Sequence, residues 1–171
     1  FIGNPNPDFV YGLNLNLRYK RLSISMLFNG VYGNDIANGN LLTIGNATGQ
    51  FQNVLSDSYY NAWRPDAPSN VHPRIGYNTV GDTAITDRII EDGSFLRLNN
   101  LTIGFDFPFE NIKLIDRFNL FVMAQNLFTW TDYSGYNPEI SSFSYDGLRN
   151  GVDWNGSPDA KNLSIGVNIN F

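Results

Sequence analysis

The side chains best suited to chemistry in this sequence are acids gathered in one short stretch. Carboxylate oxygens, the ligands that Ca²⁺ prefers, are offered by Asp82, Asp87, Glu91 and Asp92. These acids lack the fixed spacing of an EF-hand loop, so the sequence favours a solvated acidic rim over a calcium site. Glu91 and Asp92 are also unsuited to act as a glycosidase pair, because neighbours on a strand point to opposite faces.

Other reactive groups are scarce. The 171 residues include no Cys and one His, which argues against disulfides, thiolate or multi-His metal sites and Ser-His-Asp chemistry. With 11 basic and 16 acidic residues the net charge is −5, and no basic cluster offers a surface to nucleic acid. The chain has no phosphate-binding loop, dinucleotide fingerprint or nucleophile elbow. We therefore expect neither an enzyme nor a bound cofactor or metal.

Two stretches rich in turn-forming residues carry aromatic side chains beside Asp and Asn. This combination suits sugars, whose C–H faces stack on rings while their hydroxyls bond side-chain oxygens. The same rings could instead form small cores within the loops or contact a protein that covers them. The candidates for contact with a ligand or with such a lid are Tyr59, Tyr60, Trp130, Tyr133, Tyr136 and Trp154.

The elements that would position these loops alternate between apolar and polar residues. In residues 9–19 the odd positions are all apolar or aromatic, while most even positions are polar or Gly. Period two over eleven residues indicates a strand with one apolar face. The same pattern, with varying regularity, predicts five antiparallel strands at residues 9–19, 22–31, 95–107, 118–131 and 163–171. Only Lys20 and Arg21 separate the first two, which predicts a tight turn.

Two of these strands are irregular. The apolar set in residues 95–107 changes phase between Leu98 and Leu101, and a bulge or a change of neighbouring strand at Asn99 and Asn100 would reconcile the two halves. Both faces of residues 118–131 are mixed, which leaves the orientation of this strand open. Its smoother apolar stripe consists of Phe118, Leu120, Val122 and Ala124.

Three observations favour strands that cross a membrane. Eleven residues tilted by about 45° span about 25 Å, whereas soluble strands average about 5–6 residues. Charged residues make up 16% of the chain, and the polar positions hold mainly Asn, Ser, Thr and Gly. The connections alternate between short (20–21, 108–117) and long (34–87, 132–161), as in outer-membrane barrels. Five strands cannot close a barrel, so the sequence predicts the end of a larger one.

The two faces of the strands are expected to meet different media. The apolar positions should face lipid, and they include Leu13, Leu15, Leu17, Ile165 and Val167. The polar positions should face the lumen or a plug inside it, and they include Asn14, Asn16, Asn168 and Asn170. The main alternative is a soluble carbohydrate-binding β-sandwich, in which the same apolar positions would form a core. A secreted glycosidase fragment is a more remote alternative.

Specific motifs run through nearly the whole chain. They are NAWRPD at 61–66, DRIIEDGSFLRLNNLTIG at 87–104, AQNLFTWT at 124–131 and GYNPE at 135–139, together with the opening 2–9 and the ending 166–171. In this order they resemble SusC/RagA-type TonB-dependent transporters. The sequence SPDAK at 157–161 departs from the pattern, because members often carry Tyr-Pro and an Arg there.

The resemblance implies a 22-stranded outer-membrane barrel of which residues 1–171 form the carboxyl-terminal part, with two long extracellular loops. The plug and the earlier strands would lie outside this chain. It further implies import of oligosaccharides or peptides across the outer membrane of a Gram-negative bacterium of the Bacteroidetes type. A SusD-like lipoprotein lid, TonB (reached through the amino-terminal part) and membrane lipid are the implied partners. Phe171 resembles the terminal aromatic that the barrel-assembly machinery reads.

Overall fold

The computed structural model describes residues 2–45, 53–76, 85–108, 117–139, 141–143, 145–147 and 149–170. The chain forms two compact units. The sheet unit comprises Asp8–Gly33, Ser94–Asp132 and Pro158–Phe171, and the loop unit comprises Phe1–Pro7, Asn34–Gly93 and Tyr133–Ser157. None of the helices in the described ranges has the length and hydropathy that a membrane-spanning helix needs.

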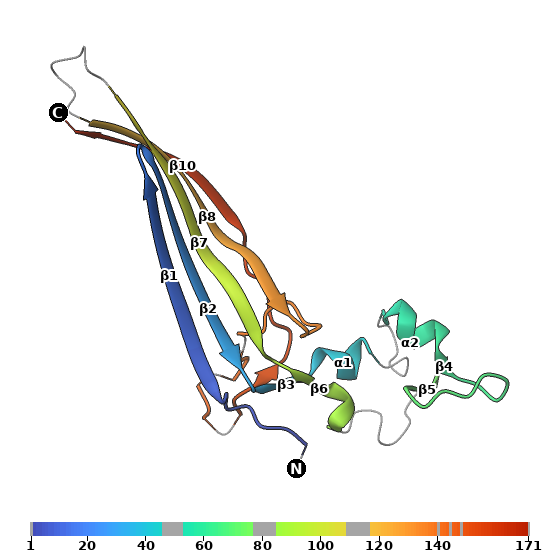
Figure 1. Ribbon diagram of the computed structural model, residues 1–171. Coiled ribbons are helices and arrows are strands. Elements are labelled where there is room, and N and C mark those ends of the chain that lie inside the picture. The colour runs from blue at the N-terminus through green and yellow to red at the C-terminus, as the bar shows by residue number, and fades with distance from the viewer. Residues whose placement is uncertain are drawn as a thin grey trace. The chain divides into compact units, whose positions relative to one another are not determined.

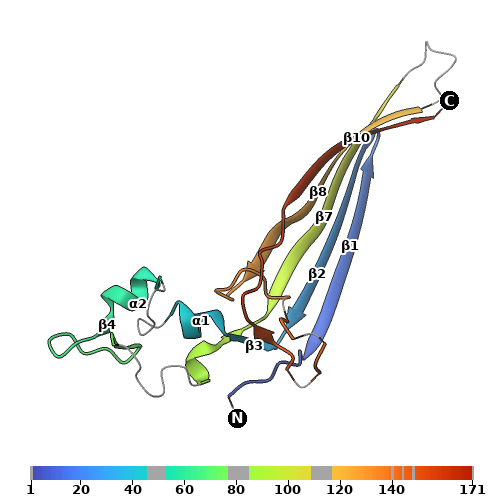
Figure 2. The same ribbon diagram turned by 180° about the vertical axis from the view of Figure 1, so that it is seen from behind.

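The sheet unit is a five-stranded antiparallel sheet in which each long strand pairs with the next one along the chain (Figures 1 and 2). Its strands are β1 (Phe9–Tyr19), β2 (Leu22–Tyr32), β7 (Phe95–Phe107), β8 (Arg117–Thr131) and β10 (Asn162–Asn170). The five predicted strands are confirmed, with bounds that agree to within a residue. Lys20 adopts a φ of 52° in the tight turn between β1 and β2.

The predicted bulge in β7 is confirmed. The pairing of β7 with β2 and with β8 shifts at this point in both cases. Leu98 and Asn100 pair with consecutive residues of β2, so Asn99 is the extra residue. On β8, Asn126 adopts the left-handed φ of 52° beside the same irregularity. The extra residue returns Leu98 and Leu101 to the same face, which removes the phase change seen in the sequence.

One face of this sheet is apolar across all five strands. Directly paired residues point to the same face, so the register identifies its rows. The central row is Leu15, Met26, Leu101, Ala124 and Leu163. The register also orients β8, because it places on this face Phe118, Leu120, Val122 and Ala124. We call this surface the apolar face.

Aromatic rings lie at both ends of the apolar face, with aliphatic side chains between them. At the end leading to the long connections they are Phe9, Tyr11, Phe28, Tyr32, Phe128 and Trp130. At the end of the short turns they are Tyr19, Phe105, Phe107 and Phe118. Many side chains of this face are exposed, from Leu15 at 36% to Leu163 at 73%. An exposed aliphatic band between two aromatic belts is the pattern of membrane-spanning strands.

The loop unit contains short elements within the two long connections. Its three-stranded sheet has the order β6-β3-β9. These strands are β3 (Asp35–Asn38), β6 (Ile90–Asp92) and β9 (Val152–Asp153). The remaining elements are α1 (Asn40–Thr43), α2 (Ser56–Tyr60), β4 (Ala62–Trp63), β5 (His72–Arg74) and the 3₁₀ helix η1 (Asp87–Ile89). Ile36, Ile89 and Tyr133 are buried in this unit and form part of its core.

Candidate functional site: the polar face and a pocket in the loop unit

The other side of the five-stranded sheet, the polar face, carries small neutral side chains. One row consists of Asn16, Ser25, Thr102, Met123 and Ser164, of which only Met123 is large and apolar. The predicted lumen-facing residues Asn14, Asn16, Asn168 and Asn170 all lie on this face. The predicted lipid-facing residues Leu13, Leu15, Leu17, Ile165 and Val167 all lie on the apolar face. The structure thus separates the two groups by face.

A cluster of charges joins three strands at the short-turn end of the polar face. The Asp106 carboxylate accepts hydrogen bonds from Arg117 Nη2 at 2.7 Å and from Arg18 Nη2 at 2.9 Å. It also accepts from Asn119 Nδ2 at 2.9 Å. Ser23 lies between Arg18 and the β7 residue Gly104 in the same row. These two small residues leave room for the Arg18 side chain to cross β2, so the cluster connects β1, β7 and β8.

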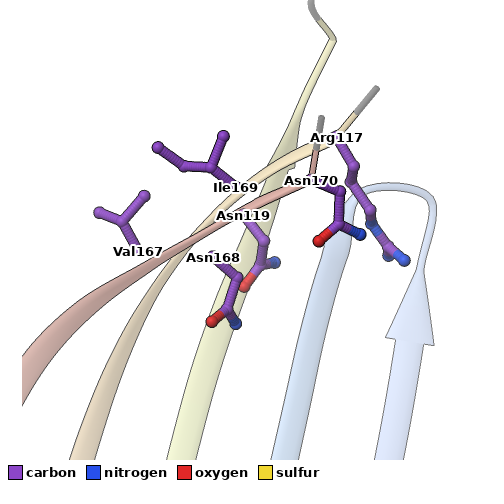
Figure 3. Close-up of a pocket in the computed structure, with 6 residues that line it drawn as sticks. All are labelled: Arg117, Asn119, Val167, Asn168, Ile169 and Asn170. Atoms are coloured by element: carbon purple, nitrogen blue, oxygen red, sulfur yellow. The ribbon is translucent and has the colours of Figure 1, made fainter. Parts of the chain in front are cut away.

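A hollow of about 630 Å³ lies beside this cluster at the β10 edge. Figure 3 shows Arg117, Asn119, Asn168 and Asn170 on one side of the strands and Val167 and Ile169 on the other. Because β10 is the last strand in the sheet order, a further strand would pair at this edge. We therefore assign no ligand to the hollow.

Arg97 anchors the segment that precedes β10 to the polar face. Its side chain is only 5% exposed. Its Nη1 donates to Asp159 Oδ2 at 2.9 Å, and its Nε donates to Thr129 Oγ1 at 3.0 Å. Asp159 belongs to the 157–161 segment, where the sequence departs from the family pattern. The structure gives this residue a function in holding that segment against the sheet.

In the loop unit, Glu91 joins three segments that are distant in sequence. Its carboxylate accepts from the Ser134 backbone N–H at 2.7 Å and from the Ser134 hydroxyl at 2.8 Å. It also accepts from Asn38 Nδ2 at 3.2 Å. Glu91 is therefore a bonded anchor and not part of a solvated rim, which corrects the sequence-based expectation for this residue. Asp87 and Asp92 are exposed, and Asp82 lies outside the described residues.

A buried pair of side chains holds the second long connection. Asp153 is fully buried, and its Oδ2 accepts from the Tyr133 hydroxyl at 2.6 Å. Its Oδ1 accepts from the Gly156 backbone N–H at 3.2 Å. Burial, followed by the hydrogen bond to Asp153, raises the pKa of the Tyr133 hydroxyl well above its ordinary value. Tyr133 therefore stays neutral and remains a donor at physiological pH.

A pocket of about 520 Å³ lies within the loop unit. Leu41, Ile44 and Leu55 contribute apolar walls, and Asn38, Tyr136 and Asn155 contribute polar groups. Asn38 is 2% exposed, and its Oδ1 has no hydrogen-bond partner within the described chain. No charged side chain lines the pocket among the residues that the structure describes. The pocket therefore offers neutral polar side chains and an exposed aromatic ring to an uncharged polar ligand.

Comparisons with known proteins agree on one group. No protein-family model matches the chain. The chain is 34% identical to TonB-dependent receptor P3 of Formosa agariphila, over 99% of the chain and 17% of the receptor. It is 26% identical to the TonB-dependent receptor SusC of Bacteroides thetaiotaomicron, over 98% of the chain and 15% of that protein. The resemblance to SusC/RagA-like TonB-dependent receptors is confirmed.

Solved structures give the same result. The chain superposes on the RagAB peptide importer in its closed-closed state with a TM-score of 0.80 and 25% identity, covering 99% of the chain and 18% of the matched chain. For the open-open state the TM-score is 0.79 with 27% identity, covering 97% and 17%. The SusC/RagA-like chain thus spans about a sixth of the length of the proteins it matches, and its sheet is a barrel segment of the predicted class.

The predicted loop aromatics of this SusC/RagA-like chain have different environments. Tyr133 is 5% exposed and bonded to Asp153, so it belongs to a small core and is withdrawn as a ligand candidate. Trp130 stacks on Phe128 on the apolar face. Tyr59 and Tyr60 are exposed on α2, with their ring centroids 5.4 Å apart. The sequence did not predict Asn38 and Asn155 as pocket residues. Phe171 lies outside the described residues.

Tyr136 is the predicted aromatic that the structure brings into the pocket, where it is 72% exposed. Trp154 contributes to the surrounding structure, because a Cβ on Gly39 would overlap its ring. Ser142 also bonds the backbone on both sides of Trp154, accepting from its N–H at 2.7 Å and donating to its carbonyl oxygen at 3.1 Å. Of the predicted aromatics, Tyr136 is therefore the one placed to contact a ligand in the pocket.

Replacing Tyr133 tests the buried pair. Tyr133→Phe removes the hydroxyl and leaves the buried Asp153 carboxylate with one fewer donor, which should destabilise the loop unit by about 2 kcal/mol. Hydrogen exchange should show faster exchange of the β9 amides. Tyr145→Phe, at an exposed position of the same connection, serves as the control and should leave exchange unchanged. Equal protection in both variants would show that the hydrogen bond contributes nothing.

Proposed function

We propose that this chain supplies five barrel strands and the outer loops of a SusC/RagA-like importer that takes up nutrients across the outer membrane. Residues 1–171 would form its carboxyl-terminal part. The observation that carries the proposal is the exposed apolar face, with its aromatic belts at both ends, in a chain 34% identical to a TonB-dependent receptor. In the sandwich alternative a second layer would bury this face, and the exposure of Leu13, Leu15 and Leu17 argues against that.

The proposal assigns a function to each surface. The apolar face would contact lipid, and the polar face would contact the lumen or an amino-terminal plug. The loop unit would lie outside the cell and meet the ligand and a SusD-like lipoprotein lid. TonB would act through the amino-terminal part of the receptor. The organism would be a Gram-negative bacterium of the Bacteroidetes type, as are the sources of the curated relatives.

Fractionation of the intact receptor tests the proposal. The receptor should appear in the outer membrane, need detergent for extraction and migrate anomalously on gels unless boiled. A lipoprotein lid should co-purify with it, and its identity can be read by mass spectrometry. A chain that is monomeric and soluble without detergent would overturn the proposal in favour of the β-sandwich.

The pocket in the loop unit makes a neutral oligosaccharide the first ligand to test. Its walls are uncharged in the described part of the chain, and Asn38, Asn40 and Asn155 line it with neutral amide side chains, a type of group that bonds sugar hydroxyls. The exposed ring of Tyr136 suits the apolar face of a sugar. RagAB, which the structure resembles, is described as a peptide importer, so neutral hexapeptides form the comparison set.

Removing the pocket ring should weaken ligand binding. Tyr136→Ala in the intact receptor is expected to weaken the binding of neutral oligosaccharides about tenfold, because it removes a stacking surface. Calorimetry with a panel of oligosaccharides and neutral hexapeptides measures this effect. Tyr145→Ala is the matched control, since Tyr145 is also exposed but does not line the pocket. Equal affinities in the two variants would show that the ligand does not bind in the pocket.

A further inference from the structure

On the apolar face, the row nearest the turn between β1 and β2 forms one wall of a second hollow. Tyr19 pairs with Leu22, and Leu22 pairs with Phe105, so the three side chains share a row. Together with Lys20 and Arg21 of the turn they line a hollow of about 630 Å³. Tyr19 is 71% exposed, and Leu22 and Phe105 are also exposed. The hollow thus has an apolar floor, and the basic side chains of Lys20 and Arg21 lie next to it.

Among the described residues at this end of the sheet, positive charges predominate. The described residues there include Arg18, Lys20, Arg21 and Arg117 against the single acid Asp106, although the whole chain carries a net charge of −5. Asp106 is bound to Arg18 and Arg117.

Unlike Arg18 and Arg117, Lys20 and Arg21 have no acidic partner among the residues that the structure describes. The ion pairs among the described residues do not include either of them. Lys20 Nζ lies 5.4 Å from the centroid of the Tyr19 ring, which places its charge at the rim of the hollow. The hollow therefore combines an apolar floor with cationic groups available to an anion.

We propose that this hollow binds a phospholipid, with the phosphate between Lys20 and Arg21 and an acyl chain along Tyr19, Leu22 and Phe105. Basic residues beside a membrane attract anionic headgroups, and Tyr rings prefer the interface between headgroups and acyl chains. The inference rests on the proposed function, which puts the apolar face in lipid and the short turns on the periplasmic side. On that side the lipid is a phospholipid of the inner leaflet, whereas the phosphates of lipid A would require the opposite side.

Native mass spectrometry of the intact receptor in detergent tests the site. The probe is phosphatidylglycerol, with diacylglycerol as the phosphate-free comparison and lipid A as the other source of phosphate. The double variant Lys20→Gln/Arg21→Gln should bind phosphatidylglycerol about 30-fold more weakly, since each basic residue near an anionic surface contributes about fivefold. The charge-preserving variant Lys20→Arg/Arg21→Lys should bind within about threefold of the unmodified receptor.

Lys161→Gln is the matched control for a loss of positive charge. Lys161 Nζ lies 5.8 Å from the centroid of the Phe128 ring, at the other end of the apolar face. This variant should change the affinity by less than about twofold if the hollow is the site.

Three results would overturn the site: unchanged binding in the double variant, an equal loss in Lys161→Gln, or tighter binding of lipid A than of phosphatidylglycerol. None of these three results contradicts the proposed function, because the assembly of the unmodified receptor in the outer membrane is measured separately. Failure of that assembly would overturn the proposed function instead.

Discussion

Leu15→Arg in the intact receptor should reduce the stability of the membrane-inserted state by about 2–4 kcal/mol, the cost of a cationic side chain at the middle of the lipid-facing band. Leu15 lies in the central row of the apolar face, paired with Met26, midway between the two aromatic belts. An Arg side chain there is too far from either interface to place its charge in water without distorting the bilayer. The measurement is urea unfolding of the receptor in lipid vesicles, together with the amount of assembled receptor in outer-membrane fractions.

Asn14→Arg is the matched control, because it adds the same charge at the adjacent position on the opposite face. Asn14 pairs with Leu27 on the polar face, so its replacement should cost less than the change at Leu15. A receptor in which Leu15→Arg is harmless would show that the apolar face does not meet lipid. Equal costs at the two positions would show that the sheet is covered by protein on both sides.

The strands could be predicted because one face of the sheet is apolar and the other polar, so apolar and polar residues alternate along each strand. β1 shows this most simply, since all its odd positions are apolar or aromatic and all its even positions except Val10 are polar or Gly. β8 did not allow the same inference, because Phe121 and Met123 are large and apolar yet lie on the polar face. Phe121 covers Gly166 of β10, where a Cβ would overlap its ring. For such a strand, only the pairing register with both neighbouring strands shows which side chains lie on which face.

The sequence predicted the types of residue in the candidate site, but not which individual residues line the pocket. Tyr133 and Tyr136 are three residues apart and equally aromatic, yet one is buried against Asp153 and the other lines the pocket. Asn38 and Asn155 join the pocket from segments more than a hundred residues apart. No periodicity links such positions, because irregular connections are positioned by individual hydrogen bonds, such as that of the Asn155 backbone N–H with Asn40 Oδ1 at 2.8 Å.

Gly30 is the position in the sheet where adding a side chain should reduce stability the most. It is buried opposite Tyr11, whose ring lies over it and whose hydroxyl donates to the Phe95 carbonyl oxygen at 3.1 Å. A Cβ at Gly30 would overlap the Tyr11 ring and lie 2.6 Å from the same carbonyl oxygen. The ring can rotate away, but Phe95 O belongs to β7 and can move only with that strand.

Gly30→Val should therefore destabilise the receptor by about 3 kcal/mol, the upper part of the usual range for overpacked sites. The loss has two physical sources: displacement of Tyr11 breaks its hydrogen bond to Phe95, and the clash with Phe95 O separates β2 from β7 at the end leading to the long connections. Urea unfolding in lipid vesicles measures the total. The variant Tyr11→Ala/Gly30→Val, compared with Tyr11→Ala alone, isolates the part due to the backbone clash.

Gly12→Val is the control that separates crowding from the loss of a strand glycine. A Cβ at Gly12 would meet only Phe28 O at 3.6 Å, an ordinary contact, and Val favours extended backbone. Gly12→Val should therefore leave stability unchanged or raise it slightly. If Gly30→Val were as well tolerated, Tyr11 would not be fixed over Gly30. The aromatic belt at this end would then be held by the surrounding lipid and not by packing within the sheet.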